Sequence, residues 1–508
     1  MSRIFRATPK LPPGSVRQRL GAIALLLLGG CAAGPDFVGP APPAVERYTP
    51  ANAAAGQSSA TFTADGQSQE VEPGRRLAAD WWRLFGSAEL DSAVQQAMAG
   101  NVTLESARAS LRQSRENLQA GYGVFYPTID LGFSAVRQRT SPLRFGVNTA
   151  SGVFNLFTLS TAISYALDVF GGERRTVEAL GAQVDYQRYT ARAAYLALSG
   201  NVVNTTIARA AYQAQIQATE ELIARQQEQL DIAKTQASAG TASYASVLSI
   251  QSQLAASQAT VPALRQKSDQ AEHLLATLAG RTPAESRPPE VDLASLALPR
   301  QLPLALPSDL VRLRPDILAA EAQLHAASAG IGIATAALFP SFSLSGTYGS
   351  NSTTFGDLGN SGGKFWSVGP SVDFPLFQGG ASWHRKQAAI EAYRKSLADY
   401  RQVVLNAFAQ VADALTALEH DAQSLDAQAQ ALRSAEQGLS LLEANYRAGL
   451  VGYLQVLVAD AQFHQAKINY LQASAQRYQD TTALFLALGS GWWNQESDAG
   501  SGQQERRR

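Results

Sequence analysis

The sequence predicts a mixed α and β membrane protein in which four strands are joined to long helices in two structural repeats. Three observations support this fold class. Two separate parts of the chain recur at nearly the same spacing, four stretches alternate between apolar and small polar residues, and two long proline-free stretches consist mainly of strong helix formers.

Charge and hydropathy narrow the class of protein. The 508 residues carry 42 Lys and Arg against 42 Asp and Glu, so the formal net charge is +0. This balance excludes a generally cationic protein that binds nucleic acid by neutralising phosphates. Mean hydropathy is −0.11, and no uncharged apolar run reaches the roughly 18 to 20 residues of a membrane-spanning helix. A polytopic helical membrane protein is therefore excluded, whereas a transmembrane β-barrel is not, because its alternating strands leave little hydropathy signal.

The first residues have the features of a bacterial signal peptide. Basic residues precede an apolar stretch at 20–28 that is too short to span a membrane, and two glycines then lead to Cys31, the single cysteine. This pattern is typical of a lipoprotein signal, so we expect cleavage after residue 30 and acylation of Cys31; the alternative is an ordinary cleavage site with an incidental cysteine. Ala32 rather than Asp follows the cysteine, which favours export to the outer membrane. One cysteine allows neither an intrachain disulfide nor a cysteine-based metal cluster.

Internal repetition sets the domain plan. Residues 101–127 align with 314–340 without a gap, and residues 239–244 align with 448–453 at nearly the same offset. Chance similarity between alanine-rich helices could explain one of these matches but not both. The predicted plan is a signal peptide at 1–30, an N-terminal anchor segment at 31–88, repeat 1 at 89–280, a linker at 281–307, repeat 2 at 308–489 and a flexible C-terminal tail at 490–508.

Each repeat contains two predicted strands. Apolar residues alternate with small, mostly hydroxylated ones near residues 128–135, 157–168, 341–348 and 366–374. A soluble sandwich would give the same alternation, but the Gly-, Ser- and Asn-rich stretches at 139–152 and 350–363 suit long exposed loops between antiparallel membrane strands. Strands of about 10 to 14 residues can cross a bilayer when tilted. Four strands cannot close a barrel, so either the chain oligomerises to form a pore or these strands are not a barrel.

The remainder of each repeat is predicted to be helical. Residues 173–236 and 381–447 lack proline and are rich in Ala, Gln, Glu and Arg. A helix over residues 173–236 would be about 96 Å long. Breaks at Gly240 and Gly449 precede shorter helices predicted at 243–279 and 453–488, and two more are predicted at 102–124 and 315–337. These helices are too polar to face lipid, so we predict a helical wall that projects from the strands into water.

Several motifs, taken in order, resemble the outer-membrane efflux proteins, the TolC-like family. The runs at 312–317, 319–324 and 337–342 are similar to the family signature. Other segments resemble the lipoprotein branch of this family, the NodT type of RND tripartite drug-efflux systems. They are Cys31 with Gly34-Pro35-Asp36-Phe37, Trp81-Trp82-Arg83-Leu84-Phe85, and the segments 376–380 and 487–493. The resemblance covers about residues 31–493.

The resemblance implies an architecture and partners. It implies a homotrimer with one 12-stranded transmembrane β-barrel, four strands from each protomer, continuous with a long periplasmic α-helical barrel. Residues 31–88, 281–307 and the tail would form an equatorial belt. The implied function is a passive exit duct for small molecules in the outer membrane of a Gram-negative bacterium, fed by an inner-membrane RND-type transporter through a periplasmic adaptor protein. No cofactor is implied besides the covalent lipid on Cys31.

The resemblance also implies a gate, because the periplasmic tip closes like an iris in this family. It places the gate at Tyr446, Arg447, Gly449, Tyr244 and Gly240. Family members often carry aspartates one and two turns beyond the tip glycine. This sequence has Gln455 and Val458 there, with Ser246 in the first repeat, and the nearest acid is Asp460. We therefore expect weak cation selectivity.

No motif indicates an enzyme. The 5 histidines are scattered, and the HExxH, GxSxG and phosphate-loop patterns are absent, so we predict no catalytic residue and no metal site. Asp168 and Asp373 occupy equivalent positions in the two repeats and are candidates for a cation-attracting ring in the lumen; the simpler interpretation is a pair of solvated carboxylates. Two other functions stay open. A type I secretion duct for polypeptides is disfavoured by the acylated cysteine, and a lipid-anchored structural coiled-coil protein is disfavoured by the alternating strands.

Overall fold

The computed structural model describes residues 32–45, 47–49, 60–73, 77–140 and 152–489. The predicted signal peptide, the predicted lipidation site at Cys31 and the predicted tail at 490–508 therefore lie outside the described residues. The described chain is mainly helical with some strands and divides into two compact units. The first unit comprises residues up to Gly39, Gln113–Asp185 and Ala322–Ala398, and the second comprises Pro40–Arg112, Tyr186–Glu321 and the chain from Asp399 onward.

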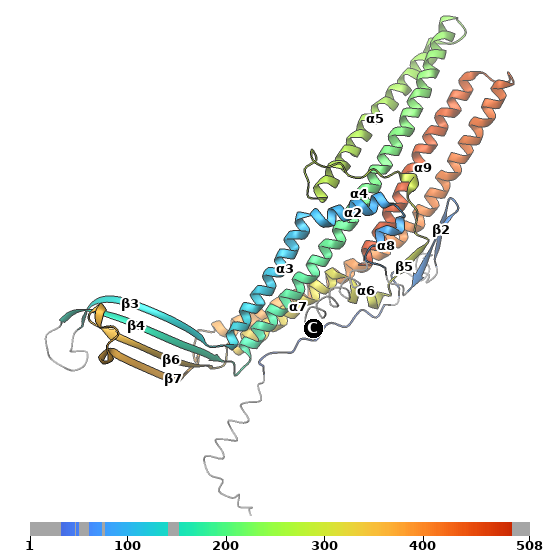
Figure 1. The fold of residues 1–508 in the computed structure, drawn as a ribbon. Coiled ribbons are helices and arrows are strands. Elements are labelled where there is room, and N and C mark those ends of the chain that lie inside the picture. The colour runs from blue at the N-terminus through green and yellow to red at the C-terminus, as the bar shows by residue number, and fades with distance from the viewer. Residues whose placement is uncertain (1–31, 46, 50–59, 74–76, 141–151, 490–508) are drawn as a thin grey trace, which may run out of the picture. The chain divides into compact units, whose positions relative to one another are not determined.

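The first unit contains a four-stranded antiparallel sheet (Figure 1). Its strands are β3 (Thr128–Thr140), β4 (Gly152–Leu167), β6 (Ser341–Ser352) and β7 (Lys364–Asp373). They pair in the order β3-β4-β6-β7. The structure confirms all four predicted strands, and each begins or ends within a few residues of glycine, proline or a polar turn.

The register of this sheet sorts its side chains onto two chemically different faces. Ile129 pairs with Ile163, Tyr165 with Leu344, and Phe342 with Val372. Opposed residues share a face, so one face gathers large apolar side chains. Ser164, Ser345 and Gly369 lie opposite one another on the other face, which is small and mostly hydroxylated. The apolar face is exposed: Leu131 retains 75% of its accessible surface and Trp366 retains 73%.

The long helices also follow the predicted pattern. They are α3 (Val102–Gly121), α4 (Gly172–Ser238), α5 (Tyr244–Leu278), α7 (Pro315–Ala336), α8 (Ala381–Arg447) and α9 (Tyr453–Ala487). Each bound lies within about three residues of its expected place, because Gly and Pro terminate helices reliably. By length and composition, α7 is the one described helix apolar enough to cross a membrane, but 44% of its apolar window is buried inside the protein.

The second unit contains a small sheet and two short helices that the sequence did not predict. β1 (Thr61–Ala64) pairs antiparallel with β2 (Gln67–Pro73), and β2 pairs parallel with β5 (Gln301–Leu304). The short helices are α2 (Ala88–Gly100) and α6 (Pro307–Leu313). Turns of 3-10 helix cover Trp81–Phe85, Tyr122–Phe125, Leu293–Ser295, Phe355–Asp357 and Ser361–Gly363.

An aromatic cluster lies in the core of the second unit. Trp81 is 1% exposed and meets Phe485 edge to face, with ring centroids 5.6 Å apart. Phe85 packs against Tyr478 in the same way at 6.0 Å. These contacts bind the 3-10 turn at Trp81–Phe85 to α9, so the Trp-Trp-Arg-Leu-Phe motif serves the core of this unit.

Candidate functional site

Two helix ends in the second unit have the same construction. At the end of α4, the Thr241 amide donates to the Gln236 carbonyl at 2.9 Å, and at the end of α8 the Leu450 amide donates to Asn445 at 2.9 Å. Gly240 and Gly449 have φ of +73° and +74°. This is the Schellman arrangement, which needs a left-handed residue and therefore favours glycine. The two glycines thus allow the chain to leave each long helix and enter α5 or α9.

The predicted gate residues have different environments at these turns. The Tyr446 ring lies 5.1 Å from the Tyr453 ring, and Arg447 pairs with Glu443 at 3.2 Å on its own helix. Tyr244 is 68% exposed. The structure therefore brings Tyr446 together with Tyr453, while Arg447 and Tyr244 lie at the surface of the chain.

A row of polar contacts joins α4 to α9. The Tyr453 hydroxyl donates to Glu228, Arg225 lies 3.4 Å from Asp460, and Lys467 donates to Glu221 at 2.7 Å. We call these three pairs the α4–α9 ladder. Residues 221, 225 and 228 follow helical spacing, as do 453, 460 and 467, so each set occupies one helix face.

The centre of the ladder is shielded from solvent. The Asp460 side chain is 13% exposed, and burial raises its pKa while nearby His464 and Arg225 oppose that shift. His464 is 8% exposed, and burial lowers its pKa although Asp460 and Glu221 act the other way. Both shifts favour the neutral form of the group. Asp460 lies 3.4 Å from Arg225 within this chain. Beyond Gly449, Gln455 and Val458 are among the exposed residues.

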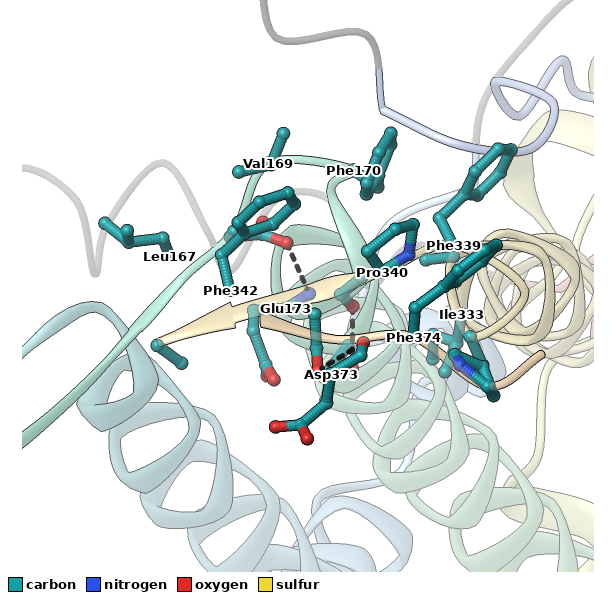
Figure 2. A pocket seen from close by; sticks show the side chains of 18 of the residues that line it. Leu167, Val169, Phe170, Glu173, Ile333, Phe339, Pro340, Phe342, Asp373 and Phe374 are labelled. Carbon is teal, nitrogen blue, oxygen red and sulfur yellow. Dashed lines mark hydrogen bonds between the residues drawn. The ribbon is translucent and has the colours of Figure 1, made fainter. Parts of the chain in front are cut away.

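The two candidate ring aspartates line one pocket in the first unit (Figure 2). The pocket has a volume of about 640 Å³ and lies where β4 and β7 end and α4 begins. Phe170 and Phe339 stack at its edge with centroids 4.6 Å apart. The structure thus brings Asp168 and Asp373 to the same pocket within a single chain, and their role as a ring in the lumen stays a prediction.

Asp168 and Asp373 differ in their contacts. Asp168 accepts hydrogen bonds from the Glu173 amide at 3.1 Å and the Arg174 amide at 3.0 Å, and its carboxylate pairs with the Arg174 side chain at 3.1 Å. It therefore neutralises the first turn of α4. Asp373 is exposed, and its carbonyl accepts a hydrogen bond from Ser341 at 3.4 Å.

Arg314, in the Arg-Pro-Asp run, is a buried residue that connects several helices of the second unit. It is 6% exposed, and its guanidinium binds Asp316 in a two-pronged contact at 3.0 and 2.6 Å. The same group donates to the Ala487 carbonyl at 2.7 Å and to Gln410 at 2.8 Å. One side chain thus connects the start of α7, the end of α9 and the middle of α8. The sequence analysis identified this run as part of the family signature, but it did not predict that Arg314 joins three helices as a clamp.

The α4–α9 ladder was also absent from the sequence-based expectations. Its partners lie more than 200 residues apart, for example Glu221 and Lys467 at a separation of 246. The available signal was the helical spacing of charged residues on each helix. That spacing is equally typical of a solvated face, so pairing could not be inferred from it.

Comparisons with known proteins agree with this architecture. A model of the outer membrane efflux protein family matches residues 93–281 and 306–490. Outer membrane protein OprJ of Pseudomonas aeruginosa is 29% identical over 482 residues, which are 93% of this chain and 96% of OprJ. The pyoverdine export outer membrane protein OpmQ of the same species is 29% identical over 481 residues, 92% of this chain and 96% of OpmQ. The solved outer-membrane channel OprN superposes with a TM-score of 0.79 at 28% identity, covering 91% of this chain and 100% of OprN. The chain therefore belongs to the outer membrane efflux protein family and is a protein of the Gram-negative outer membrane.

Proposed function

We propose that this protein is the outer-membrane channel of a tripartite efflux system. In this role it is a passive exit duct for small molecules, which an inner-membrane RND-type transporter delivers through a periplasmic adaptor protein. The observation that carries the proposal is a sheet with one apolar and one hydroxylated face, joined directly to helices of 67 residues. The apolar face suits lipid and the other face suits a water-filled lumen. A duct of this kind needs no catalytic residue.

The free edges of the sheet indicate a closed ring of copies. β3 and β7 are its two edges, and inside a bilayer an unpaired edge would leave backbone groups without partners. Successive strands are antiparallel, so β7 of one copy can pair antiparallel with β3 of the next. Two copies would give eight strands, whose interior is filled by side chains. We infer a homotrimer, in which three sheets of four strands make a 12-stranded barrel.

The helices would supply the periplasmic part of the duct. α4 and α8 have 67 residues each, and α5 and α9 have 35 each. These equal lengths and the shared turn at Gly240 and Gly449 support two structural repeats. We infer that three copies form a long α-helical barrel, with residues 31–88 and 281–307 in an equatorial belt around it.

The gate is proposed at the two helix turns. Three copies would gather Tyr446, Arg447, Gly449, Tyr244 and Gly240 around one axis. Within each protomer, the α4–α9 ladder would hold the α4–α5 pair against the α8–α9 pair, and opening would separate the two pairs. Buried polar networks suit such a role, because loss of one partner leaves the others unsatisfied.

The membrane anchor is proposed to be a covalent lipid on Cys31. Replacement of Cys31 by Ser should abolish labelling by a radioactive or clickable fatty acid and leave the precursor uncleaved. Folding should survive, because the barrel supplies its own membrane attachment. Normal fatty-acid labelling of the Cys31→Ser protein would reject the assignment.

Transport is tested by complementation. A strain that retains an RND-type transporter and its adaptor but lacks their outer-membrane channel should accumulate a fluorescent efflux substrate. Expression of this protein together with a compatible adaptor and transporter should lower that accumulation to the level of the parent strain. Unchanged accumulation, despite a trimer correctly located in the outer membrane, would contradict the proposed function.

A further inference from the structure

The outer end of the four-stranded sheet, where β3 and β6 end and β4 and β7 begin, carries cations on the apolar face. β3 pairs with β4 without interruption, so every second residue of β3 from Ile129 onward lies on that face. Arg137 and Arg139 belong to this set and are exposed. On β7, the exposed Lys364 shares the apolar face with Trp366. Three cations therefore lie at the end of a face that is otherwise mostly apolar.

The two arginines have no internal anion to neutralise them. Among the residues that the structure describes, neither guanidinium has a hydrogen-bond or ion-pair partner. The residues opposite them on β4 are Asn155 and Val153, which carry no charge. Asp357, in the turn that follows β6, instead accepts hydrogen bonds from Thr354 and Asn360 in its own loop. Both positive charges are thus available to an external ligand.

Aromatic side chains lie on the same face beside the arginines. Phe355, from the 3-10 turn after β6, meets Phe133 and Phe157 edge to face, with ring centroids 6.0 Å apart in both pairs. Phe133 and Phe157 lie on the apolar face of β3 and β4, so this turn folds over that face. We call the three residues the phenylalanine cluster. Aromatic residues mark the level at which lipid tails meet headgroups in membrane barrels. Arg137 follows Phe133 by about 14 Å along a tilted strand, so its long side chain can reach the headgroups just beyond that level.

We propose that this end of the sheet binds the phosphorylated glycolipid of the outer leaflet of the outer membrane. The inference rests on the proposed membrane barrel, in which the apolar face meets lipid. The opposite strand ends adjoin α3 and α4 in sequence, so the end with the cations would lie on the outside of the cell. A lipid with both phosphates and acyl chains matches a surface that has cations above an aromatic cluster.

The geometry suits one phosphate held by both arginines. The Cα atoms of Arg137 and Arg139 are about 7 Å apart on one face of a strand, so both guanidiniums can reach the same group. Arginine binds phosphate through two parallel hydrogen bonds, which makes it suited to this ligand. Asn155, opposite Arg137, can add a side-chain amide donor. The phenylalanine cluster would pack against the acyl chains.

In the proposed trimer, each site would draw on two protomers. β7 of one copy would pair with β3 of the next, and Lys364 lies at the same outer end of the sheet as Arg139. Lys364 of one copy would therefore lie near the arginines of its neighbour. A glycolipid bound there would bridge two protomers, and three such sites would surround the barrel.

Titration of the purified full-length trimer with a defined lipid tests the site. The probe is doubly phosphorylated lipid A, and native mass spectrometry counts the bound molecules. Wild type should bind up to three per trimer, and Arg137→Gln with Arg139→Gln should raise the Kd by at least about tenfold. Arg108→Gln with Arg112→Gln is the matched control, because it removes two exposed arginines from α3, and its Kd should equal that of wild type.

Two further lipids separate the glycolipid phosphates from other sources of affinity. Wild type should bind dephosphorylated lipid A and phosphatidylglycerol at least about tenfold more weakly than the doubly phosphorylated form. Equal affinity of wild type for doubly phosphorylated and dephosphorylated lipid A would overturn the phosphate site, and equal affinity for phosphatidylglycerol would overturn the assignment to a glycolipid. These comparisons need only wild type, so the proposal stays testable if the glutamine substitutions impair assembly.

The remaining outcomes distinguish this site from the proposed function. An unchanged Kd in an assembled Arg137→Gln and Arg139→Gln trimer would reject the site alone, as would a wild-type trimer that conducts ions in planar bilayers but binds no lipid A. Protein that forms neither a trimer nor a channel would reject the proposed barrel, and the glycolipid site with it.

Discussion

The hydrogen bond from Tyr453 to Glu228 gives the most specific test of the proposed gate. It is the ladder contact nearest to the Gly449 turn, and the Tyr453 ring also packs against Tyr446. The bond to Glu228 and partial burial raise the pKa of Tyr453 to about 12, so the hydroxyl remains a donor at all physiological pH values. Tyr453→Phe removes this donor and keeps the ring.

The magnitude follows from the exposure of the partners. A hydrogen bond to a charged group contributes about 1.5 to 3 kcal/mol. The Glu228 side chain is 42% exposed, so solvent screening lowers the expected loss to about 1 kcal/mol per protomer. This favours the open state about fivefold per protomer. If three protomers open together, the combined shift is about a hundredfold.

Single-channel recording in planar bilayers measures this shift. Tyr453→Phe should raise the open probability, and Tyr446→Ala should raise conductance because it removes the ring that packs on Tyr453. Tyr470→Phe is the matched control, since its hydroxyl donates to the carboxylate of Asp65 at 2.8 Å away from the turn. If Tyr453→Phe and Tyr470→Phe changed open probability equally, the ladder would not be a gate element.

Three further substitutions have defined outcomes. Burial and a hydrogen bond to Asp480 raise the pKa of Asp421 to about 8. The stability that Asp421 contributes is therefore complete below its unfolded pKa of about 3.9 and is lost as pH rises through about 8. In denaturant titrations at pH 8.5, the free energy of unfolding of Asp421→Asn should exceed that of wild type by at least about 1 kcal/mol, and equal values would contradict the shift. Arg314→Lys should cost about 2 kcal/mol in the same titration, because a lysine cannot bind Asp316, Gln410 and Ala487 at once; a loss no larger than that of the exposed Arg312→Lys would contradict the clamp. Asp460→Asn should leave the reversal potential in a salt gradient unchanged, because the Asp460 side chain is only 13% exposed and lies 3.4 Å from Arg225; loss of strong cation selectivity would show that it forms an acidic ring.

Much of the fold was predictable because its signals are local. The bounds of α8 follow from the glycines at 379–380 and 449, and the strand faces follow from alternation within 10 to 16 residues. The small sheet was missed because β2 pairs with β5, which lies more than 200 residues away, and the four residues of β5 carry no pattern of their own.

The same difference between local signals and long-range contacts applies to the candidate sites. The glycine turns at the ends of α4 and α8 could be located from the sequence, because a left-handed residue is a local requirement. The partners of Tyr453 and Arg314 could not, because each contact joins elements distant along the chain. The role of Asp168 as a cap of α4 could have been inferred, since it precedes the predicted helix start by only five residues.

Assembly is the central claim, because one sheet of four strands encloses nothing by itself. Native mass spectrometry of the detergent-purified, processed protein tests it most directly. We expect one dominant species with three times the mass of the acylated chain, which dissociates to single chains only under harsh activation. A stable monomer, or a stable dimer, would contradict both the barrel and the duct.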